Sequence, residues 1–404
     1  MIGYNGKKYA MDGVERPVSP KTTYWPPESG DAGVREAAEV LVSGGIVAFP
    51  TETVYGLGAD ARRPEAVERI FAAKGRPADN PLIVHAGRLE DAVALAAEVS
   101  PLEMRLMERF WPGPLTLVLP VRRGAVAPQV TAGLDTVAVR VPDHPLARRL
   151  IAKAGCPIAA PSANRSGRPS PTVAAHVLED LYGRIDGVLD GGPTGVGVES
   201  TVVRVLDGVI YILRPGGVTA EMLQECAGDD AVVVEAAEGT AASGGNAGVG
   251  AAAGARAGAG AERASAAPGG PAFAAGAFDS ATPRSPGVKY THYAPRGEML
   301  LVTGDPARVR EAVQAAARRK REEGRRVGIL ACREHAAAYE ADAVIVLGPR
   351  EAPEEAARNL YAALRECDAQ ELEAIVAEGF PETGIGSALM NRLRKAAGGN
   401  VLAV

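Results

Sequence analysis

The chain has 404 residues, which is more than one ordinary domain needs and predicts two domains. Hydrophobic residues make up 47% of the chain and aromatic residues only 4%, so we expect a core of Val, Ile, Leu and Ala, as in α/β proteins. The net charge of −5 argues against a chain-wide electrostatic grip on nucleic acid, so any anion site must be local.

The cysteines and histidines give no metal or disulfide pattern. The four cysteines are far apart in the sequence without a CxxC pair, and the five histidines include no HExxH. The N-terminus has no apolar leader region, and no run approaches the roughly 18 apolar residues that a membrane span requires. We therefore predict a cytoplasmic protein without a membrane segment.

The first part of the chain mixes helical and strand patterns. Residues 34–41 have helical spacing and end at a Gly-Gly pair, and Pro64 opens a second helix. Two apolar runs flank Asp207-Gly208, which predicts a β-hairpin. Short apolar stretches predict strands at residues 46–49, 82–85, 115–119, 137–141 and 157–160. A hairpin beside helix-linked strands implies a mixed sheet.

A segment of different composition follows. From about Glu235 to Ser285 the chain is almost entirely Ala, Gly and Ser, which cannot bury enough surface to offset the entropy of ordering. We interpret it as a flexible linker, although its alanines also favour transient helix. Beyond it, strands alternate with helices, and Asp305-Pro306 has the N-cap and N1 residues of a long helix. This alternation predicts a small, doubly wound parallel sheet.

Two polar loops follow apolar strands or helices in the first domain, where α/β sheets commonly bind ligands. Residues 50–58 (PTETVYGLG) place hydroxyls and a carboxylate beside glycines, which let a ligand approach the backbone. The alternative is a tight polar turn that Thr53 caps. Residues 74–81 (KGRPADNP) place Lys74 and Arg76 around a glycine, and phosphoryl and nucleotidyl transfer both need such cationic groups. Basic residues are also ordinary at a helix end, and His85 on an apolar strand is usually a core histidine.

Three further features carry polar groups at strand ends. Residues 160–171 (APSANRSGRPSP) hold three serines, an asparagine and two arginines, which offer many donors to phosphate or ribose oxygens. The alternative is a polar loop made rigid by proline. Arg140 lies inside an apolar strand and needs a partner if it is buried, often a carboxylate, or else it points outward. Ser200 precedes the predicted hairpin, and Arg214 follows it. The alternative is that Arg214 is a surface arginine at a turn, because Pro-Gly-Gly follows it.

Taken together and in order, these segments indicate a protein family more specifically than any one segment does. In order from about Ile46 to Gly217, PTETVYGLG, KGRPADNPLIVH, FWPGPLTLVL, TAGLDTVAVRVP, APSANRSGRPSPT, GVESTVVRV and ILRPG resemble the threonylcarbamoyl-AMP synthase family. Residues 285–295 (SPGVKYTHYAP) look like the signature that joins the two domains in the longer form of that family. Residues 384–392 (GIGSALMNR) are similar to its C-terminal end.

The resemblance implies an α/β architecture. Its first domain is YrdC-like, a twisted mixed sheet with helices around a cavity, and its second is a small Rossmann-like, doubly wound parallel sheet. We expect an N-terminal tail at 1–30, a YrdC-like catalytic domain at 31–230, a flexible Ala/Gly-rich linker ending in a lid signature at 231–297, and the Rossmann-like domain at 298–404.

The resemblance also implies an activity, that of an L-threonylcarbamoyladenylate synthase. This nucleotidyltransferase uses ATP with Mg²⁺, bicarbonate and L-threonine to form threonylcarbamoyl-AMP and pyrophosphate for tRNA modification. The residues implied to bind L-threonine are Thr53, His85, Arg140, the Ala160 backbone and Ser200. Those implied to bind ATP are Lys74, Arg76, Asn80, Thr136, Ser162, Ser170 and Arg214, with Lys74 and Arg76 catalytic and either Tyr290 or Tyr293 closing over the nucleotide. No protein ligand to a metal is implied.

Two alternatives remain open at this point. A carbamoyltransferase of hydrogenase maturation contains a similar domain, but such proteins also carry an acylphosphatase-like domain and cysteine-rich zinc fingers, and the four scattered cysteines do not fit the latter. A non-catalytic RNA-binding module is opposed by the acidic net charge and by the lack of an aromatic stacking pattern. For the synthase, the resemblance implies a separate tRNA threonylcarbamoyl transferase as downstream partner, and at most weak contact with tRNA.

Overall fold

The computed structural model describes residues 3–4, 7–8, 22–235 and 293–404, all of which belong to one compact unit of the chain. The expected lid residue Tyr290 and most of the expected linker fall in residues 236–292, outside the described residues. Near the N-terminus, β1 (Gly3–Tyr4) and β2 (Lys7–Lys8) pair antiparallel.

The first domain is built on an eleven-stranded sheet with the order β13-β12-β11-β7-β8-β6-β9-β5-β4-β10-β3. Its strands are β3 (Thr23–Trp25), β4 (Val47–Phe49), β5 (Gly56–Asp60), β6 (Ile83–His85), β7 (Leu115–Pro120), β8 (Thr136–Arg140), β9 (Ile158–Ala159), β10 (Gly187–Leu189), β11 (Thr201–Leu206), β12 (Val209–Arg214) and β13 (Val232–Glu235). Strand β8 pairs parallel with β6 and antiparallel with β7, so the expected mixed sheet is confirmed.

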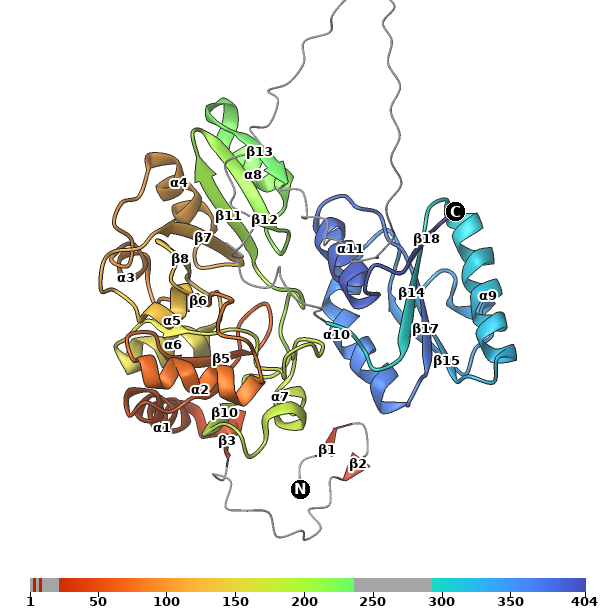
Figure 1. Ribbon diagram of the computed structural model, residues 1–404, viewed down its shortest axis with the longest axis horizontal. Helices are drawn as coiled ribbons and strands as arrows, with labels where there is room; N and C mark the ends of the chain where they lie inside the picture. Colours follow the sequence, from red (N-terminus) through yellow and green to blue (C-terminus); the bar gives the residue numbers. More distant parts are fainter. Residues whose placement is uncertain (1–2, 5–6, 9–21, 236–292) are drawn as a thin grey trace, which may run out of the picture. The chain divides into compact units, whose positions relative to one another are not determined.

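Helices pack on both faces of this sheet (Figure 1). In β4, Phe49 packs with Leu41 and Leu150 in one cluster, while Ala48 packs with Ile70 in another, because successive side chains of a strand point to opposite faces. The helices are α1 (Gly30–Val42), α2 (Pro64–Lys74), α3 (Leu89–Val93), α4 (Pro101–Phe110), α5 (Pro128–Thr131), α6 (Pro145–Ala154), α7 (Ala174–Leu181) and α8 (Ala220–Ala227), with 3-10 turns at Pro27–Ser29 and Gly228–Asp230.

The predicted hairpin is confirmed, since β11 and β12 pair antiparallel around Asp207 and Gly208. Both residues have positive φ, 48° and 74°, as a two-residue hairpin turn requires. Strand β5 differs from expectation, because part of the predicted polar loop is a buried strand. A Cβ atom at Gly58 would lie 2.7 Å from side-chain atoms of Ile158 and Phe49, so only glycine permits this close packing.

The sheet also extends into both stretches that flank the expected catalytic domain. Strand β3 lies within the expected tail 1–30 and pairs parallel with β10. Strand β13 lies within the expected linker 231–297 and pairs parallel with β12. Backbone pairing at the two edges of the sheet orders both segments, and their aromatic and β-branched residues (TYW in β3, VVVE in β13) suit strands.

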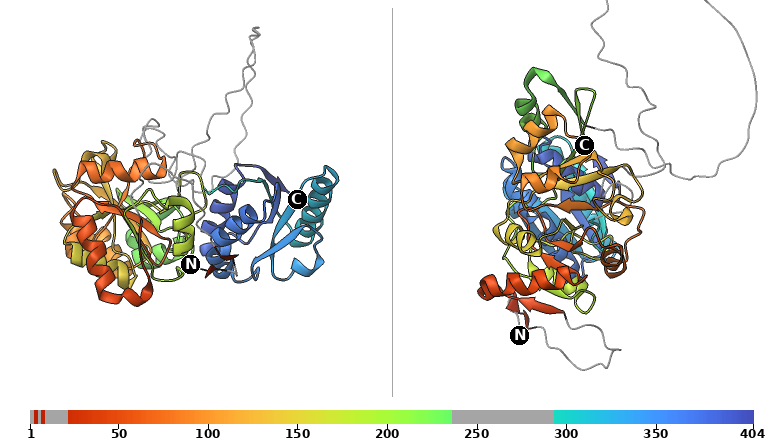
Figure 2. Two further views of the ribbon diagram at one scale, coloured as in Figure 1. Left: turned by 90° about the horizontal axis from the view of Figure 1, so that it is seen from below. Right: turned by 90° about the vertical axis from the view of Figure 1, so that its left-hand side faces the viewer.

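The second domain contains a five-stranded parallel sheet with the order β16-β15-β17-β14-β18, as expected of a doubly wound fold. Its strands are β14 (Glu298–Thr303), β15 (Val327–Cys332), β16 (Ala343–Gly348), β17 (Ala374–Glu378) and β18 (Val401–Ala403). Helix α9 (Pro306–Glu322) packs on one face, and α10 (Pro353–Ala369) and α11 (Ile385–Ala396) pack on the other, with a 3-10 turn at Ala336–Ala338 (Figure 2).

The predicted start of the long helix is confirmed, because the Asp305 side chain accepts hydrogen bonds from the backbone N–H groups of Ala307 and Arg308. Within the described residues, no helix combines the length and apolarity that crossing a membrane takes.

Candidate active site

Loops from separate parts of the sequence meet at one cavity of about 650 Å³, counting its open mouth. They include the loop after β4, the loop 160–171 after β9 and the residues just before β11. The sequence-predicted residues that line it are Thr53, Arg76, His85, Arg140, Ala160, Ser162, Ser200, Arg214 and Tyr293. The fold thus brings together groups that are up to 240 positions apart, counting from 53 to 293.

Arg140 ends β8 at the cavity wall and is buried. Its Nη1 donates to Thr53 Oγ1 at 3.0 Å, its Nη2 lies 2.6 Å from Glu52 Oε1, and its Nε donates to the Gly113 carbonyl at 3.2 Å. The carboxylate partner that a buried arginine needs is therefore present, and the outward-facing alternative is wrong. These contacts fix the guanidinium group in the wall of the cavity.

His85 lies beside Arg140, since β6 and β8 pair these two residues in register. Burial, together with the positive charge of Arg140, lowers the pKa of His85 to about 3. The imidazole is therefore neutral at neutral pH and can donate or accept a hydrogen bond in the cavity without adding charge.

His85 should also make folding stability depend on pH. Its pKa is lower in the folded than in the unfolded chain, so its contribution is complete above about pH 6.5 and is lost as the pH falls toward 3. We expect His85→Gln to reduce the loss of stability between pH 7 and 5 by about 2 kcal/mol, measured by urea unfolding. Some dependence should persist, because burial also lowers the pKa of His176 to about 3. An unchanged pH dependence in His85→Gln would contradict a buried neutral histidine.

Ser200 and Arg214 form a second polar wall. Arg214 Nη2 donates to the Ser200 carbonyl at 2.9 Å and to Ser200 Oγ at 3.2 Å. Ser200 Oγ also lies 2.8 Å from Thr116 Oγ1, and both hydroxyls are buried. Arg214 is buried at the end of β12, so the alternative of a surface turn is wrong.

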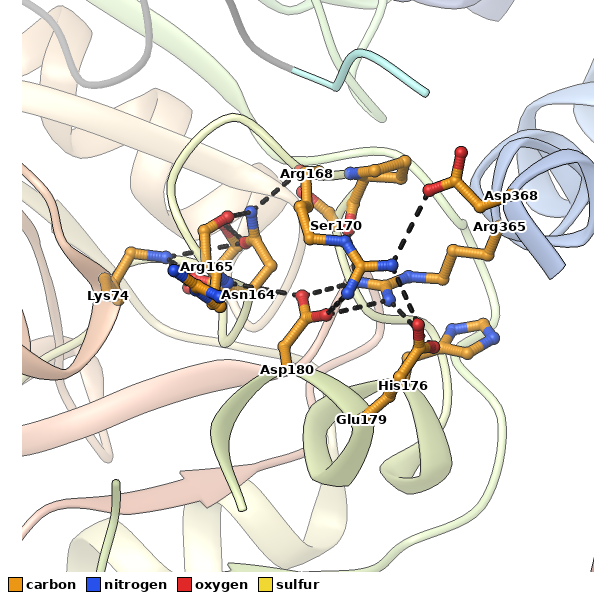
Figure 3. A network of polar contacts seen from close by, with 12 residues as sticks. Lys74, Asn164, Arg165, Arg168, Ser170, His176, Glu179, Asp180, Arg365 and Asp368 are labelled. Carbon is orange, nitrogen blue, oxygen red and sulfur yellow. Dashed lines mark hydrogen bonds and ion pairs between the residues drawn. The ribbon is translucent and has the colours of Figure 1, made fainter. Parts of the chain in front are cut away.

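Lys74 holds the loop 160–171 through backbone hydrogen bonds, and Figure 3 shows its side chain next to Asn164 of that loop. Lys74 Nζ donates to the backbone carbonyls of Ser162 and Asn164, each at 2.5 Å, and Ser162 Oγ bonds Asn164 Oδ1 at 2.5 Å. Burial, with the nearby charge of Arg76, lowers the pKa of Lys74 well below its usual value. Lys74 itself does not line the cavity, so its side chain supports the loop that presents Ser162.

Among the described residues, three other predicted residues stand outside the cavity lining. Ser170 is buried and donates to Glu199, which does line it, at 2.6 Å. Asn80 is fully buried, and its side-chain amide has no hydrogen-bond partner among the described residues. Thr136 begins β8, about 13 Å along the strand from Arg140 at its other end. Tyr290 is outside the described residues. The geometry therefore gives Thr136 no support as an ATP ligand.

Glu199 is the main functional candidate that the sequence did not single out. Burial opposes its ionisation, but Arg392 and Arg214 outweigh this effect and lower the pKa of Glu199 to about 2. Thr51 and Asn164 also line the cavity. Both belong to motifs described in the sequence analysis, and their positions next to Thr53 and Ser162 could have indicated that they line the same site. The cavity thus contains a permanent carboxylate among its arginines.

A separate polar cluster occurs in the second domain, at the ends of β15 and β17. Ligand-type atoms of Cys332, His335 and Glu378 all lie within 4.8 Å of one another. Glu378 accepts from the Cys332 backbone N–H and the Tyr339 hydroxyl, and its Oε1 lies 2.6 Å from His335 Nδ1. Both carboxylate oxygens are engaged, so internal hydrogen bonding accounts for the cluster.

A buried arginine pair, several hydroxyls and a neutral histidine around one cavity of an α/β sheet define a binding site for a small anionic ligand. A family model described as "Telomere recombination" (Sua5_yciO_yrdC) matches residues 39–216, and one described as "Threonylcarbamoyl-AMP synthase, C-terminal domain" matches residues 218–398.

Full-length relatives agree with these matches. The threonylcarbamoyl-AMP synthase of Bacillus subtilis (strain 168) is 45% identical over 93% of this chain and 95% of its own length. That of Pyrococcus abyssi is 44% identical over 92% and 96%. The crystal structure of P. abyssi Sua5 complexed with L-threonine has a TM-score of 0.79 at 41% identity and covers 95% of this chain and 99% of its own. The chain belongs to the threonylcarbamoyl-AMP synthase family of enzymes, and the expected fold is confirmed.

Proposed function

We propose that this enzyme is a nucleotidyltransferase that makes threonylcarbamoyl-AMP and pyrophosphate from ATP, bicarbonate and L-threonine. The observation that carries the proposal is one cavity with two differently equipped sides. Arg140, Thr53 and His85 lie on one side, and Arg76 and Arg214 add positive charge elsewhere in the wall. Membership of the family and the similarity to an L-threonine complex support this pairing of substrates.

The Arg140 side suits L-threonine. Its guanidinium can meet the substrate carboxylate at two points, because each terminal nitrogen carries two hydrogens. The Ala160 N–H already donates to the Ile83 carbonyl at 2.9 Å, so the Ala160 carbonyl is the backbone group left to meet the substrate amine. The Thr53 and Ser200 hydroxyls line the same cavity and suit the substrate hydroxyl.

The remaining wall suits a triphosphate. Arg76 and Arg214 bring positive charge, and Ser162 brings a hydroxyl on a loop that Lys74 holds in place. We propose that ATP enters as its Mg²⁺ complex. The cavity offers oxygen donors of the hard type that Mg²⁺ prefers, but the Glu199 carboxylate is already bonded to Ser170, so phosphate oxygens would supply most of the ligands.

The reaction requires no nucleophile from the enzyme. The threonine amine adds to bicarbonate with loss of water, which gives a carbamate. A carbamate oxygen then attacks the α-phosphorus of ATP, the bond from that phosphorus to the β-phosphate oxygen breaks, and pyrophosphate leaves. The enzyme contributes alignment of the two substrates and stabilisation of the charge that develops on the phosphates. Tyr293 lines the cavity, and we propose that it covers the bound nucleotide.

The test is to incubate the purified chain with ATP, Mg²⁺, bicarbonate and L-threonine. We expect threonine-dependent release of pyrophosphate and a product with the mass of threonylcarbamoyl-AMP. Absence of both would refute the activity. Adenylate formation that is independent of threonine would favour a carbamoyltransferase instead, and salt-sensitive tRNA binding without ATP turnover would favour the RNA-binding alternative.

The product is a mixed anhydride, which hydrolyses readily and must be passed to an acceptor. We propose a separate tRNA threonylcarbamoyl transferase in the cytoplasm as the enzyme that consumes it, with at most weak contact between this chain and tRNA, given the net charge of −5.

We propose that Asn80 contributes to ATP binding, as the resemblance implies; it does not line the cavity, but its carbonyl lies 3.4 Å from Nη2 of Arg76, which does. The fully buried side-chain amide of Asn80 has no hydrogen-bond partner among the described residues, so it destabilises the fold by about 1–3 kcal/mol unless a ligand or water satisfies it. We expect Asn80→Leu to keep or raise the free energy of unfolding while raising the KM for ATP by about tenfold. Thermal unfolding and steady-state kinetics measure the two effects. An unchanged KM would remove Asn80 from the ATP site.

A further inference from the structure

Two helices of the second domain place buried polar side chains against the loops of the cavity. On α10, Tyr361, Arg365 and Asp368 share one face, because they are four and three residues apart. Arg392 lies on α11. Tyr361 and Arg392 are fully buried, and Arg365 and Asp368 are only 4% and 6% exposed. Polar groups buried to this extent need partners. Tyr361, Arg365 and Arg392 have partners in the first domain, whereas Asp368 accepts from the Arg296 backbone N–H at 2.7 Å and lies 3.6 Å from Arg168 of the first domain.

The first set of contacts surrounds Glu199. Arg392 Nε donates to Glu199 Oε2 at 2.9 Å, and the Tyr361 hydroxyl lies 2.8 and 3.0 Å from the two carboxylate oxygens. The Tyr293 ring lies against Tyr361, with a centroid distance of 5.3 Å, and the Arg392 guanidinium lies 5.6 Å from the Tyr293 ring centre. Because Glu199 and Tyr293 both line the cavity, side chains of the second domain support part of its wall.

The second set of contacts holds the loop 160–171 (Figure 3). Arg365 Nη2 donates to the Pro169 carbonyl at 2.6 Å and to Asp180 Oδ2 at 2.9 Å. Asp180 Oδ2 also accepts from the Arg165 backbone N–H at 3.2 Å, and Arg168 lies 3.6 Å from Asp368. This loop carries Ser162 and Ser170, two of the residues that the resemblance assigns to ATP, and of these Ser162 lines the cavity.

We propose that Tyr361, Arg365 and Arg392 are positioning residues, which hold the nucleotide side of the cavity in its binding geometry from the second domain. This inference rests on the proposed function, since it presumes that ATP binds there. None of the three lines the cavity, so each acts through Glu199 or the loop 160–171 and does not touch the substrates. Among the described residues, the partners of Arg140 all belong to the first domain, and Ser200, which adjoins Glu199, is held by Thr116 of the same domain at 2.8 Å. Loss of the supporting contacts should therefore weaken ATP binding more than L-threonine binding.

The decisive variant is Tyr361→Phe in the full-length chain, because it removes one hydroxyl and leaves the ring against Tyr293. We expect the KM for ATP to rise at least about tenfold, as for a lost hydrogen bond to a charged group. The dissociation constant for L-threonine alone, measured by calorimetry, should change less than about twofold. Arg392→Gln should have a larger effect of the same kind, and Arg392→Lys should restore part of the ATP affinity, because it keeps the charge but not the planar geometry.

The matched control is Arg394→Gln on the same helix, which breaks the exposed pair with Glu382 and should leave both substrates unaffected. A second readout is the double variant Tyr361→Phe with Glu199→Gln, in which the tyrosine change should have little further effect if it acts through Glu199. Equal losses of ATP and threonine affinity, or an unchanged KM for ATP in Tyr361→Phe and Arg392→Gln, would overturn the inference. The wild-type chain separates this outcome from failure of the proposed function, which would abolish threonine-dependent pyrophosphate release before any substitution.

Discussion

Replacing Arg140 with alanine should lower threonine-dependent pyrophosphate release by at least about 100-fold, as for the loss of a group that positions and stabilises charge. Arg140 is the cation of the side assigned to L-threonine, and it holds Thr53 in place at 3.0 Å. The substitution would also leave Glu52, 2.6 Å from the guanidinium, without its ion-pair partner. We expect kcat/KM for threonine to fall much more than the KM for ATP changes.

Arg140→Ala also risks the fold, since removing one member of a buried ion pair costs about 3–5 kcal/mol. Arg140→Lys is the matched variant. It keeps a positive charge near Glu52 but cannot make the two-point contact with a carboxylate, so the chain should fold while its KM for threonine rises. Circular dichroism and thermal unfolding check the fold. Wild-type kinetics for threonine in Arg140→Lys would contradict the proposed carboxylate contact.

Lys74→Ala and Arg76→Ala should each reduce turnover by about 100-fold, but for different physical reasons. Arg76 lines the cavity, so its loss should weaken charge stabilisation and leave the fold intact. Lys74 instead bonds the carbonyls of Ser162 and Asn164 from behind the loop, so its loss should release that loop. We therefore expect Lys74→Ala to lower the thermal midpoint more than Arg76→Ala, because the Arg76 bonds to the Asn80 and Pro81 carbonyls are long, at 3.4 and 3.3 Å.

Two further variants separate charge from support. Lys74→Met keeps the aliphatic stem and removes the amine, so it isolates the loss of the two carbonyl bonds. Arg88→Gln is an exposed control that breaks only the surface pair with Asp91 and should change neither rate nor stability. Equal thermal midpoints and equal turnover for Lys74→Ala and wild type would show that Lys74 neither supports the loop nor contributes to catalysis.

The apolar strands could be predicted because each is buried in the sheet, and burial selects branched residues at successive positions. Strand β5 could not, since Gly58 is required by close contact with Phe49 and Ile158, and glycine is the usual mark of a turn. Strands β3 and β13 were not predicted because each is only three or four residues long and was included in the expected tail or linker, although TYW and VVVE are strand-forming residues.

The residues of the cavity could be predicted where a local motif surrounds them. The tyrosine and arginine that support Glu199 could not, because nothing near Tyr361 or Arg392 in the sequence indicates a partner 162 or 193 positions away. Nor did the motifs reveal that Lys74 lies behind the wall of the cavity. The sequence of a lysine at a helix end is the same whether its amine binds a phosphate or a backbone carbonyl.

Gly58 is not the only glycine that sets a distance in this molecule. At Gly197, where φ is 83°, an added Cβ atom would lie 2.3 Å from the Cα atom of Arg358 on α10. A methyl group at residue 197, two residues before Glu199, would therefore force α10 away from this part of the chain. Since a hydrogen bond is lost beyond about 3.5 Å, the bonds from Tyr361 would be among the first to break. The close approach of α10 to the chain that leads to Glu199 therefore depends on Gly197 having no Cβ atom.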